Sequence, residues 1–386
     1  IVYDTRTGTQ LQAGEETKDK TTDKDPNINR YNMEEFDFDK LMPQVSFAFN
    51  PDDGLFLGGG VLLQKDGFRK EPFASRQKIT GNYAMATSSY GLFYEGEFVD
   101  AIGKANFLLK AEIRAPNFVN NFFGLGNESV FDDDLELTFY RTRFQAYFLN
   151  PSLAWDVGKN AQFVLGARFM DVEIEENRNR FITDFDQNGL DPEGFFDHKS
   201  YLGPSIGFHF DSRADEFVND RGITFNTELR YNIALTDNTD NSAVLKSDLT
   251  LRYALDAMGR ASVATRVGYQ KSFGDFEFFQ AAVLDGFDNM RGYRRYRFRG
   301  ESSFYQQLDI RIDLFEWQNY ILPSKVGLIL FNDFGRVWID GEDSDTWHHG
   351  YGGGFYLTPF GRFTLNLLLA KSREDFLPLF KFGFYF

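Results

Sequence analysis

The sequence contains no cysteine, only 4 histidines and 11 prolines, and no long apolar run. Without cysteine there is no disulfide framework, no thiolate metal site and no cysteine nucleophile. No stretch approaches the roughly 18 consecutive apolar residues that a membrane-spanning helix requires. Positive charge is also scarce, because 41 Lys and Arg face 57 Asp and Glu and the net charge is −16. This balance argues against non-specific binding to nucleic acid, which needs a basic face.

What the sequence has in abundance is phenylalanine, with 45 residues of 386, and a hydropathy period of two. From about Leu41 onward, segment after segment alternates apolar with polar residues, which a helix cannot satisfy and a strand can. The clearest run has as its apolar face Ile223, Phe225, Thr227, Leu229, Tyr231, Ile233 and Leu235. This alternation predicts an all-β fold.

Two features of these runs separate them from the strands of a soluble sandwich. They last about 10–13 residues, whereas strands in globular proteins are usually about 5–6 residues long. Charged residues such as Glu228, Asp309 and Asp313 also recur in the middle of the polar face. Both features are expected of a lipid-embedded barrel, whose tilted strands cross about 25 Å of hydrocarbon around a wet interior. A propeller or sandwich with solvated outer faces remains the alternative.

The number and spacing of the strands predict a closed barrel over residues 41–386. We count 16 antiparallel strands, and an even number is typical of bacterial outer-membrane barrels. Short connections such as 158–160 alternate with long ones such as 116–136, 176–198 and 272–302. Short periplasmic turns and long outer loops produce this asymmetry. We therefore predict a transmembrane β-barrel in the outer membrane of a Gram-negative cell.

The two ends of the chain differ from its middle. Residues 1–40 are polar, above all residues 15–32 with their mixed charges, and predict a periplasmic segment or tether. Because the chain starts at Ile1 without a leader, we expect it to be processed or trimmed. The final strand ends on Phe386, which resembles the terminal signal by which outer-membrane barrels are recognised for assembly, so we expect Phe386 to be the natural end.

The sixth outer connection is rich in arginine. Five arginines fall within nine positions, namely Arg291, Arg294, Arg295, Arg297 and Arg299. Aromatic residues lie between them, so an RNA-binding patch is one interpretation, but the charge of −16 speaks against it. A guanidinium group suits a carboxylate with two parallel hydrogen bonds. The sequence therefore predicts a loop that folds inward and is anchored on carboxylates of the barrel interior.

Two motifs carry a resemblance to a known family. Arg291-Gly292-Tyr293 resembles the Arg-Gly-Phe/Tyr signature of the BamA/TamA-like superfamily, the bacterial surface antigen barrels. Residues 331–335, with Asp333 and Gly335, resemble the family's Phe-x-Asp-x-Gly motif on the following strand. The resemblance implies that Arg291 pairs with Asp333 and locks the loop. Members that insert or export proteins usually carry periplasmic POTRA domains, for which residues 1–40 are too short. We therefore expect a trimmed member or a branch without POTRA domains.

The seam between the first and last strands is the predicted working site. Pro43 and Pro378 lack a ladder donor, Gly383 weakens the last strand, and Phe386 ends it. A weak seam exposes a strand edge that an incoming strand can join by β-augmentation. The resulting hypothesis is a barrel that assists insertion or translocation of polypeptides. The expected partners are outer-membrane lipid, lipopolysaccharide, unfolded outer-membrane protein clients and accessory periplasmic or surface proteins.

Two other functions remain open, a passive pore and a membrane anchor for an upstream domain missing from this chain. No local motif indicates an enzyme, and no cofactor is expected. Asp184, Asp186 and Asn188, followed by Gly189, match the start of a calcium loop. The bidentate Glu of such a loop is replaced by Phe195. We therefore expect a solvated loop tip there, with calcium binding as the alternative.

Overall fold

The computed structural model describes residues 2–12, 14–23, 38–67, 70–213, 221–320, 322–361 and 363–384. The chain divides into two compact units, residues 1–39 and Lys40–Phe386. In the first unit, Val2 bridges Asp19, and the Thr7 hydroxyl donates to Asp23 at 2.8 Å. The predicted tether falls in this unit. Its residues 24–37 lie outside the described residues, so the tether stays a prediction.

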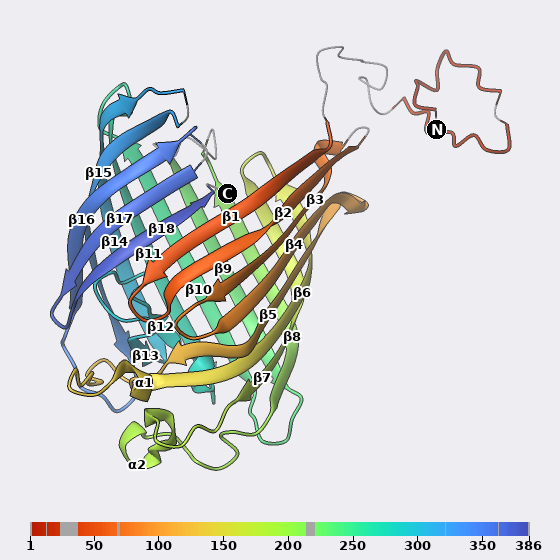
Figure 1. Cartoon of the computed structure of the whole chain (residues 1–386). Coiled ribbons are helices and arrows are strands. Elements are labelled where there is room, and N and C mark those ends of the chain that lie inside the picture. The colour runs from red at the N-terminus through yellow and green to blue at the C-terminus, as the bar shows by residue number, and fades with distance from the viewer. Residues whose placement is uncertain are drawn as a thin grey trace. The chain divides into compact units, whose positions relative to one another are not determined.

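The second unit is a closed antiparallel barrel of sixteen strands (Figure 1), which confirms the predicted fold class. Its strands are β1 (Lys40–Asn50), β2 (Gly54–Gly67), β3 (Lys70–Ala84), β4 (Ser89–Ile102), β5 (Ala105–Asn121), β6 (Arg141–Val157), β7 (Ala161–Ile174), β8 (Lys199–Asp211), β9 (Gly222–Ala234), β10 (Ser242–Ala254), β11 (Ala261–Gly274), β14 (Ser302–Trp317), β15 (Ser324–Trp338), β16 (His348–Pro359), β17 (Phe363–Ser372) and β18 (Phe376–Phe384). Neighbours in sequence are neighbours in the barrel, and β1 closes it against β18.

Short elements lie in the long connections. They are α1 (Leu137–Tyr140), η1 (Phe181–Thr183), α2 (Phe185–Asn188), η2 (Phe278–Gln280), β12 (Ala282–Leu284) and β13 (Phe298–Gly300). The strands β12 and β13, which lie between β11 and β14 in sequence, pair as a separate two-stranded sheet, and Arg299 of β13 also bridges Gly126. None of the described helices is long and apolar enough to cross a membrane.

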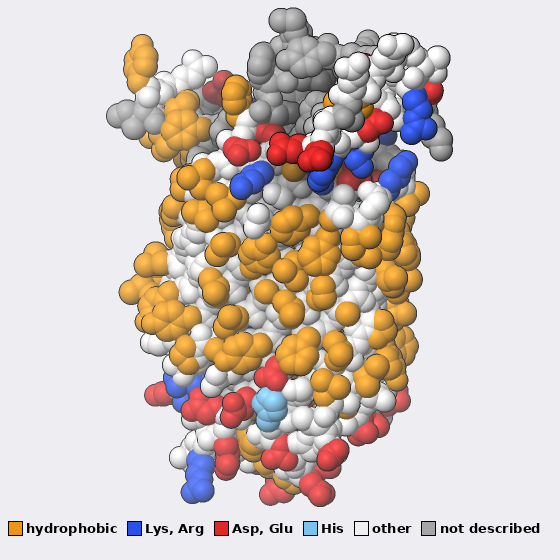
Figure 2. All heavy atoms as spheres, turned by 90° about the vertical axis from the view of Figure 1, so that its right-hand side faces the viewer, with side chains coloured by type: hydrophobic (Ala, Val, Ile, Leu, Met, Phe, Trp, Pro, Cys, Tyr) orange, Lys and Arg blue, Asp and Glu red, His pale blue; other side chains and the backbone are white. Residues whose placement is uncertain are grey.

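The period-two pattern sets which side chains face outward. In β9, Ile223, Leu229, Tyr231 and Ile233 are exposed on the outer surface, while Asn232 on the alternate face is buried. Side chains of this kind cover the middle of the barrel in Figure 2, with charged side chains gathered beyond them. An apolar belt between charged rims is the surface that a bilayer requires.

One predicted boundary is wrong. The connection expected at 116–136 instead runs from 122 to 140, because β5 continues to Asn121 and β6 begins only at Arg141. The strand continues past Pro116 because its pairing with β6 shifts register between Arg114 and Phe118. At such a bulge a proline, which has no N–H to donate, interrupts no regular ladder bond.

The inner face of the barrel is partly dry. Phe144 of β6, Met170 of β7 and Tyr201 of β8 are buried against the long connections. We call this group the apolar loop cluster; it comprises Phe122, Phe144, Ala146, Met170, Val172, Ile174, Ile182, Phe195, Tyr201 and Phe278. The expectation of a wet, charged interior therefore fails at the loop ends of β6–β8, because apolar loop residues cover the inner face there.

Candidate functional site

The sixth outer connection, residues 275–301, is built around the β12–β13 pair. Ala282 pairs with Gly300 and Leu284 with Phe298. The segment that follows β12 is held by Asp285, whose carboxylate accepts the backbone N–H of Phe287 at 2.7 Å. Asp and Asn side chains stabilise turns in this way. Burial raises the pKa of Asp285, and the charge of Arg295 acts in the opposite direction.

Arg291 lies in this connection and contacts two carboxylates of the barrel wall. Its Nε and Nη2 donate to the two oxygens of Asp333 at 2.7 and 2.6 Å, and Nη2 also donates to Asp309 at 2.7 Å. The guanidinium lies 4.0 Å from the ring centroid of Phe331. Asp333 is 0% exposed. A bidentate, stacked arrangement of this kind is specific for arginine and is not reproduced by lysine.

Glycines let the connection lie directly on the strands. A Cβ on Gly350 of β16 would stand 1.8 Å from the Arg291 carbonyl oxygen. Gly335 of β15 leaves room for Leu284, which a Cβ would approach to 3.2 Å. Gly292 has a φ of +96° and lies against the backbone of Lys371 in β17. Larger residues at these positions would push the connection away from the wall.

Tyr293 anchors the connection through packing. It is 3% exposed and belongs to a buried cluster with Leu284, Met290, Phe298, Tyr305 and Val337. Its ring centroid lies 5.4 Å from that of Phe298, in an edge-on contact. The five residues taken from the two sequence motifs thus lie together, although 42 positions separate Arg291 from Asp333.

The sequence did not reveal where the other arginines bind. Arg294 and Arg295 bind Asp52 and Asp53 in the turn after β1, and Arg297 binds Glu374 in the turn before β18. Burial raises the pKa of Asp52, while the backbone N–H of Arg295 and the charge of Arg294 act in the opposite direction. The pairs of acidic residues in the first and last outer turns were the sequence signal from which these partners could have been inferred.

The seam between β1 and β18 is short. Within the described residues it comprises three pairs, Phe47 with Phe382, Ala48 with Lys381 and Phe49 with Phe380. The other side of β1 pairs with β2 over eleven residues. Phe47 stacks on Phe380 and Phe382 with centroids 5.3 and 4.4 Å apart.

The seam residues named from the sequence lie in or beside this junction. Pro43 pairs with Val61 of β2 and Pro378 with Leu369 of β17, so both lie outside the three seam pairs. Gly383 pairs with Thr364 of β17. Phe386 lies outside the described residues. Proline on the free side of an edge strand leaves no donor for a partner strand there.

The predicted calcium loop forms a compact turn. Asn188 at the end of α2 is buried, and its amide nitrogen donates to the Phe181 carbonyl at 2.8 Å while its Oδ1 accepts from Leu190 at 2.9 Å. Phe195, at the position of the missing ligand, is buried in the apolar loop cluster. No group of three or more His, Asp or Glu side chains suited to a metal occurs in the described part of the chain. Calcium binding by Asp184 and Asp186 stays a prediction.

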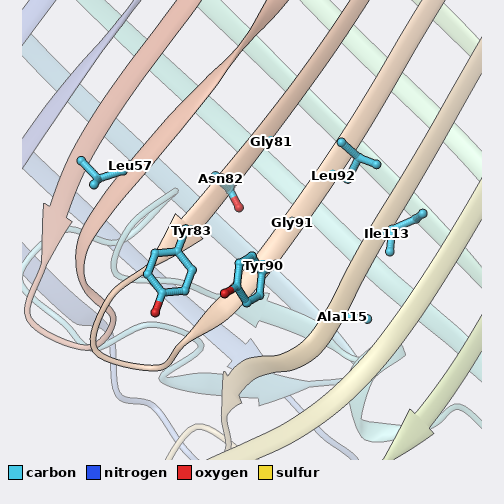
Figure 3. Close-up of a pocket in the computed structure, with 9 residues that line it drawn as sticks. All are labelled: Leu57, Gly81, Asn82, Tyr83, Tyr90, Gly91, Leu92, Ile113 and Ala115. Carbon is cyan, nitrogen blue, oxygen red and sulfur yellow. The ribbon is translucent and has the colours of Figure 1, made fainter.

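A shallow depression of about 410 Å³ lies on the outer surface of β2–β5 (Figure 3). Gly81 and Gly91 form its floor, and Leu57, Tyr83 and Tyr90 are among its walls. Its nine lining residues include no Ser, His, Asp or Glu. The depression offers a mainly apolar surface.

Comparison with solved structures identifies the fold. BamA from Haemophilus ducreyi lacking POTRA domains 1–3 matches with a TM-score of 0.63 at 13% identity, over 90% of this chain and 70% of that one. CdiB from Escherichia coli matches with a TM-score of 0.58 at 12% identity, over 89% of this chain and 62% of that one. The chain has the barrel fold of BamA and CdiB. CdiB from Acinetobacter baumannii agrees, with a TM-score of 0.57 at 11% identity, over 89% of this chain and 59% of that one.

The BamA-type barrel confirms the fold inferred from the motifs. The matched part of this chain spans about 60% of each CdiB chain. No protein-family model and no curated protein matches the sequence. A sixteen-stranded BamA-type barrel with an apolar outer belt is an outer-membrane β-barrel of the Gram-negative type.

Proposed function

We propose that this outer-membrane barrel assists the insertion or translocation of polypeptides, with the β1–β18 seam as the working site. The observation that carries the proposal is the contrast, within the described residues, between three residue pairs at the seam and eleven on the other side of β1. The likeness to BamA and CdiB supports a role of this general kind. The barrel itself then acts as a scaffold without catalytic chemistry.

Among the described residues, the edge at the seam is the first half of β1. Residues 40–46 pair with β2, and no partner in β18 is described for them. A strand edge with free N–H and C=O groups is a template for a further strand. Unfolded outer-membrane protein segments, with their period-two pattern, are the clients that fit such an edge. Outer-membrane lipid and lipopolysaccharide surround it.

We also propose that the sixth connection folds into the barrel and is locked there by Arg291 and Asp333. The carboxylate of Asp333 lies on the inner face of β15, next to Phe331 and alternating with the exposed Leu330. The hydrogen bonds between the two side chains support this placement. The glycine at position 350 supports it too, because a Cβ there would clash with the backbone of Arg291. A plugged barrel of this kind conducts poorly, which speaks against the passive pore. The anchor hypothesis is tested by whether the full-length protein carries a further domain.

The proposal is tested by tying the seam shut. Ala48→Cys with Lys381→Cys places two thiols at directly opposed positions of the seam, in a chain without other cysteines. We expect the oxidised protein, in proteoliposomes, to insert a urea-unfolded outer-membrane barrel at least tenfold more slowly than the reduced protein. Reductant should restore the insertion rate, because cleaving the disulfide allows the seam to open again.

The matched control ties a fully paired position. Glu228→Cys with Lys246→Cys joins β9 to β10, where eleven residue pairs already hold the strands. This cross-link should leave insertion unchanged. Equal insertion rates for the oxidised and reduced seam variant would contradict the proposal.

A further inference from the structure

Four carboxylates flank the seam at one end of the barrel. Asp52 and Asp53 lie in the turn between β1 and β2, and Glu374 and Asp375 lie in the turn between β17 and β18. Because β1 and β18 are the two sides of the seam (Figure 1), the two acidic turns stand on either side of it. Like charges so placed would repel each other and favour an open seam if nothing lay between them.

Arg294 of the sixth connection lies between the two turns. Its Nε donates to Asp375 at 2.7 Å, and its Nη1 donates to Asp52 at 3.0 Å. One guanidinium group therefore holds a carboxylate from each side of the seam. These three residues are far apart in sequence, with 242 positions between Asp52 and Arg294.

The neighbouring arginines each hold one side. Arg295 donates from Nη1 to Asp53 at 2.6 Å. Arg297 donates from Nε and Nη2 to the two oxygens of Glu374, both at 2.8 Å. Both arginines belong to the same short segment as Arg294, so the segment ties β1 to β18 through its backbone as well. We call these three arginines and their four carboxylates the arginine bridge.

The arginine bridge is shielded from water. The side chains of Arg297 and Asp52 are 1% and 3% exposed, and that of Arg294 is 18% exposed. Ion pairs in such surroundings are screened much less than surface pairs, and separating them strands buried charges. Within the described residues, the seam itself has three residue pairs and the stacking of Phe47 on Phe380 and Phe382.

We infer that the arginine bridge, rather than strand pairing, holds the seam closed, so that Arg294 and Arg297 are positioning residues that regulate its opening. This inference rests on the proposed function, because it names what controls the same seam. The Arg291–Asp333 pair has a separate task, since it binds the connection to β15 and touches neither side of the seam. Opening then requires the three arginines to release at least one acidic turn.

The test measures amide hydrogen exchange at the seam in the full chain. In the double variant Arg294→Gln with Arg297→Gln, we expect amides of residues 45–50 and 379–384 to exchange at least tenfold faster than in the unmodified protein. Amides of the β9–β10 pair should be unchanged. The single variant Arg294→Lys keeps both Arg297 and a positive charge between Asp52 and Asp375. It should therefore retain most of the protection that the double variant loses.

The control removes an arginine far from the seam. Arg260 is exposed and pairs with Asp256 in the turn between β10 and β11, so Arg260→Gln should leave seam exchange unchanged. If the double variant does not fold, Glu374→Gln weakens the same bridge from its more exposed partner and should accelerate seam exchange several-fold. Unchanged seam exchange, or equal acceleration throughout the barrel, would overturn the inference.

The two proposals fail in distinguishable ways. One outcome is faster seam exchange in the double variant together with an insertion rate that the Ala48–Lys381 cross-link does not change. This outcome would support the arginine bridge and contradict the assembly function. The opposite outcome is slower insertion with the cross-link together with unchanged seam exchange in the double variant. It would contradict the arginine bridge and support the assembly function.

Discussion

At the scale of single residues, position decides what each arginine of the sixth connection does. Arg291 faces Asp333 and Asp309 on the barrel wall, whereas Arg297 faces Glu374 in a turn. The side chains are chemically identical, and only the carboxylates around them differ. Arg299 has no carboxylate within ion-pair distance among the described residues and donates instead to carbonyl groups such as that of Phe278 at 3.0 Å.

Replacing Arg291 should loosen the sixth connection. Arg291→Ala leaves the buried carboxylate of Asp333 without its partner, a loss that typically costs about 3–5 kcal/mol. We expect amides of residues 285–296 to exchange at least tenfold faster in the variant, measured by hydrogen exchange. Arg230→Ala is the control, because Arg230 pairs with the half-exposed Glu228 away from the connection. Unchanged protection of residues 285–296 would show that the pair does not lock the loop.

At the scale of elements, the strands follow a local rule and the connections do not. Every barrel strand alternates its faces, so the exposed Leu165 and Leu202 identify the inner faces of β7 and β8 by parity alone. Phe195, in the connection between β7 and β8, instead packs on an aromatic residue of another connection, since its ring stacks on that of Phe278 at 5.7 Å. Its order comes from contacts between distant segments.

The apolar loop cluster should contribute strongly to stability. Phe122 is 0% exposed and meets Phe278 edge-on at 5.3 Å. Phe122→Ala should lower the free energy of unfolding by about 3–5 kcal/mol, because a large buried ring is lost and a cavity remains. Denaturant titration in detergent measures this change.

The control for that variant is a ring of the same size on the outer surface. Phe355 of β16 is 52% exposed, so Phe355→Ala should cost much less than Phe122→Ala. Equal losses for the two variants would mean that the cluster is not a folded core.

At the scale of the whole molecule, the outer surface requires a non-aqueous environment. Exposed apolar side chains occur on strands all around the barrel, among them Leu57, Leu165, Tyr253, Leu330 and Leu369. Soluble proteins rarely expose a continuous apolar patch beyond a few hundred Å².

The purified chain should therefore need detergent or lipid. We expect it to aggregate when detergent is removed and to sediment as a single species when detergent is present. Analytical ultracentrifugation distinguishes the two states. A single sharp species in plain buffer would contradict the membrane assignment, and the proposed seam function with it.

Much of the barrel was predictable from the sequence because strand parity is a local property. Alternation placed Leu330 outward and Asp333 inward. The two short motifs predicted a pair of Arg291 with Asp333, whose side chains are hydrogen-bonded, and the loop lock by this pair stays a prediction. The connection predicted at 116–136 was placed too early, because its first residues continue β5 beyond a bulge that alternation does not reveal.

The sequence by itself determined the number of strands, the side of each strand that faces lipid and the two motifs of the sixth connection. These follow from a repeat of two residues and from short patterns along the chain. Only the tertiary structure decided that Asp52 and Asp375 share Arg294 and that β1 meets β18 over three residue pairs within the described part of the chain. The physical reason is closure of the barrel, which brings the first and last strands together and leaves no local trace in the sequence.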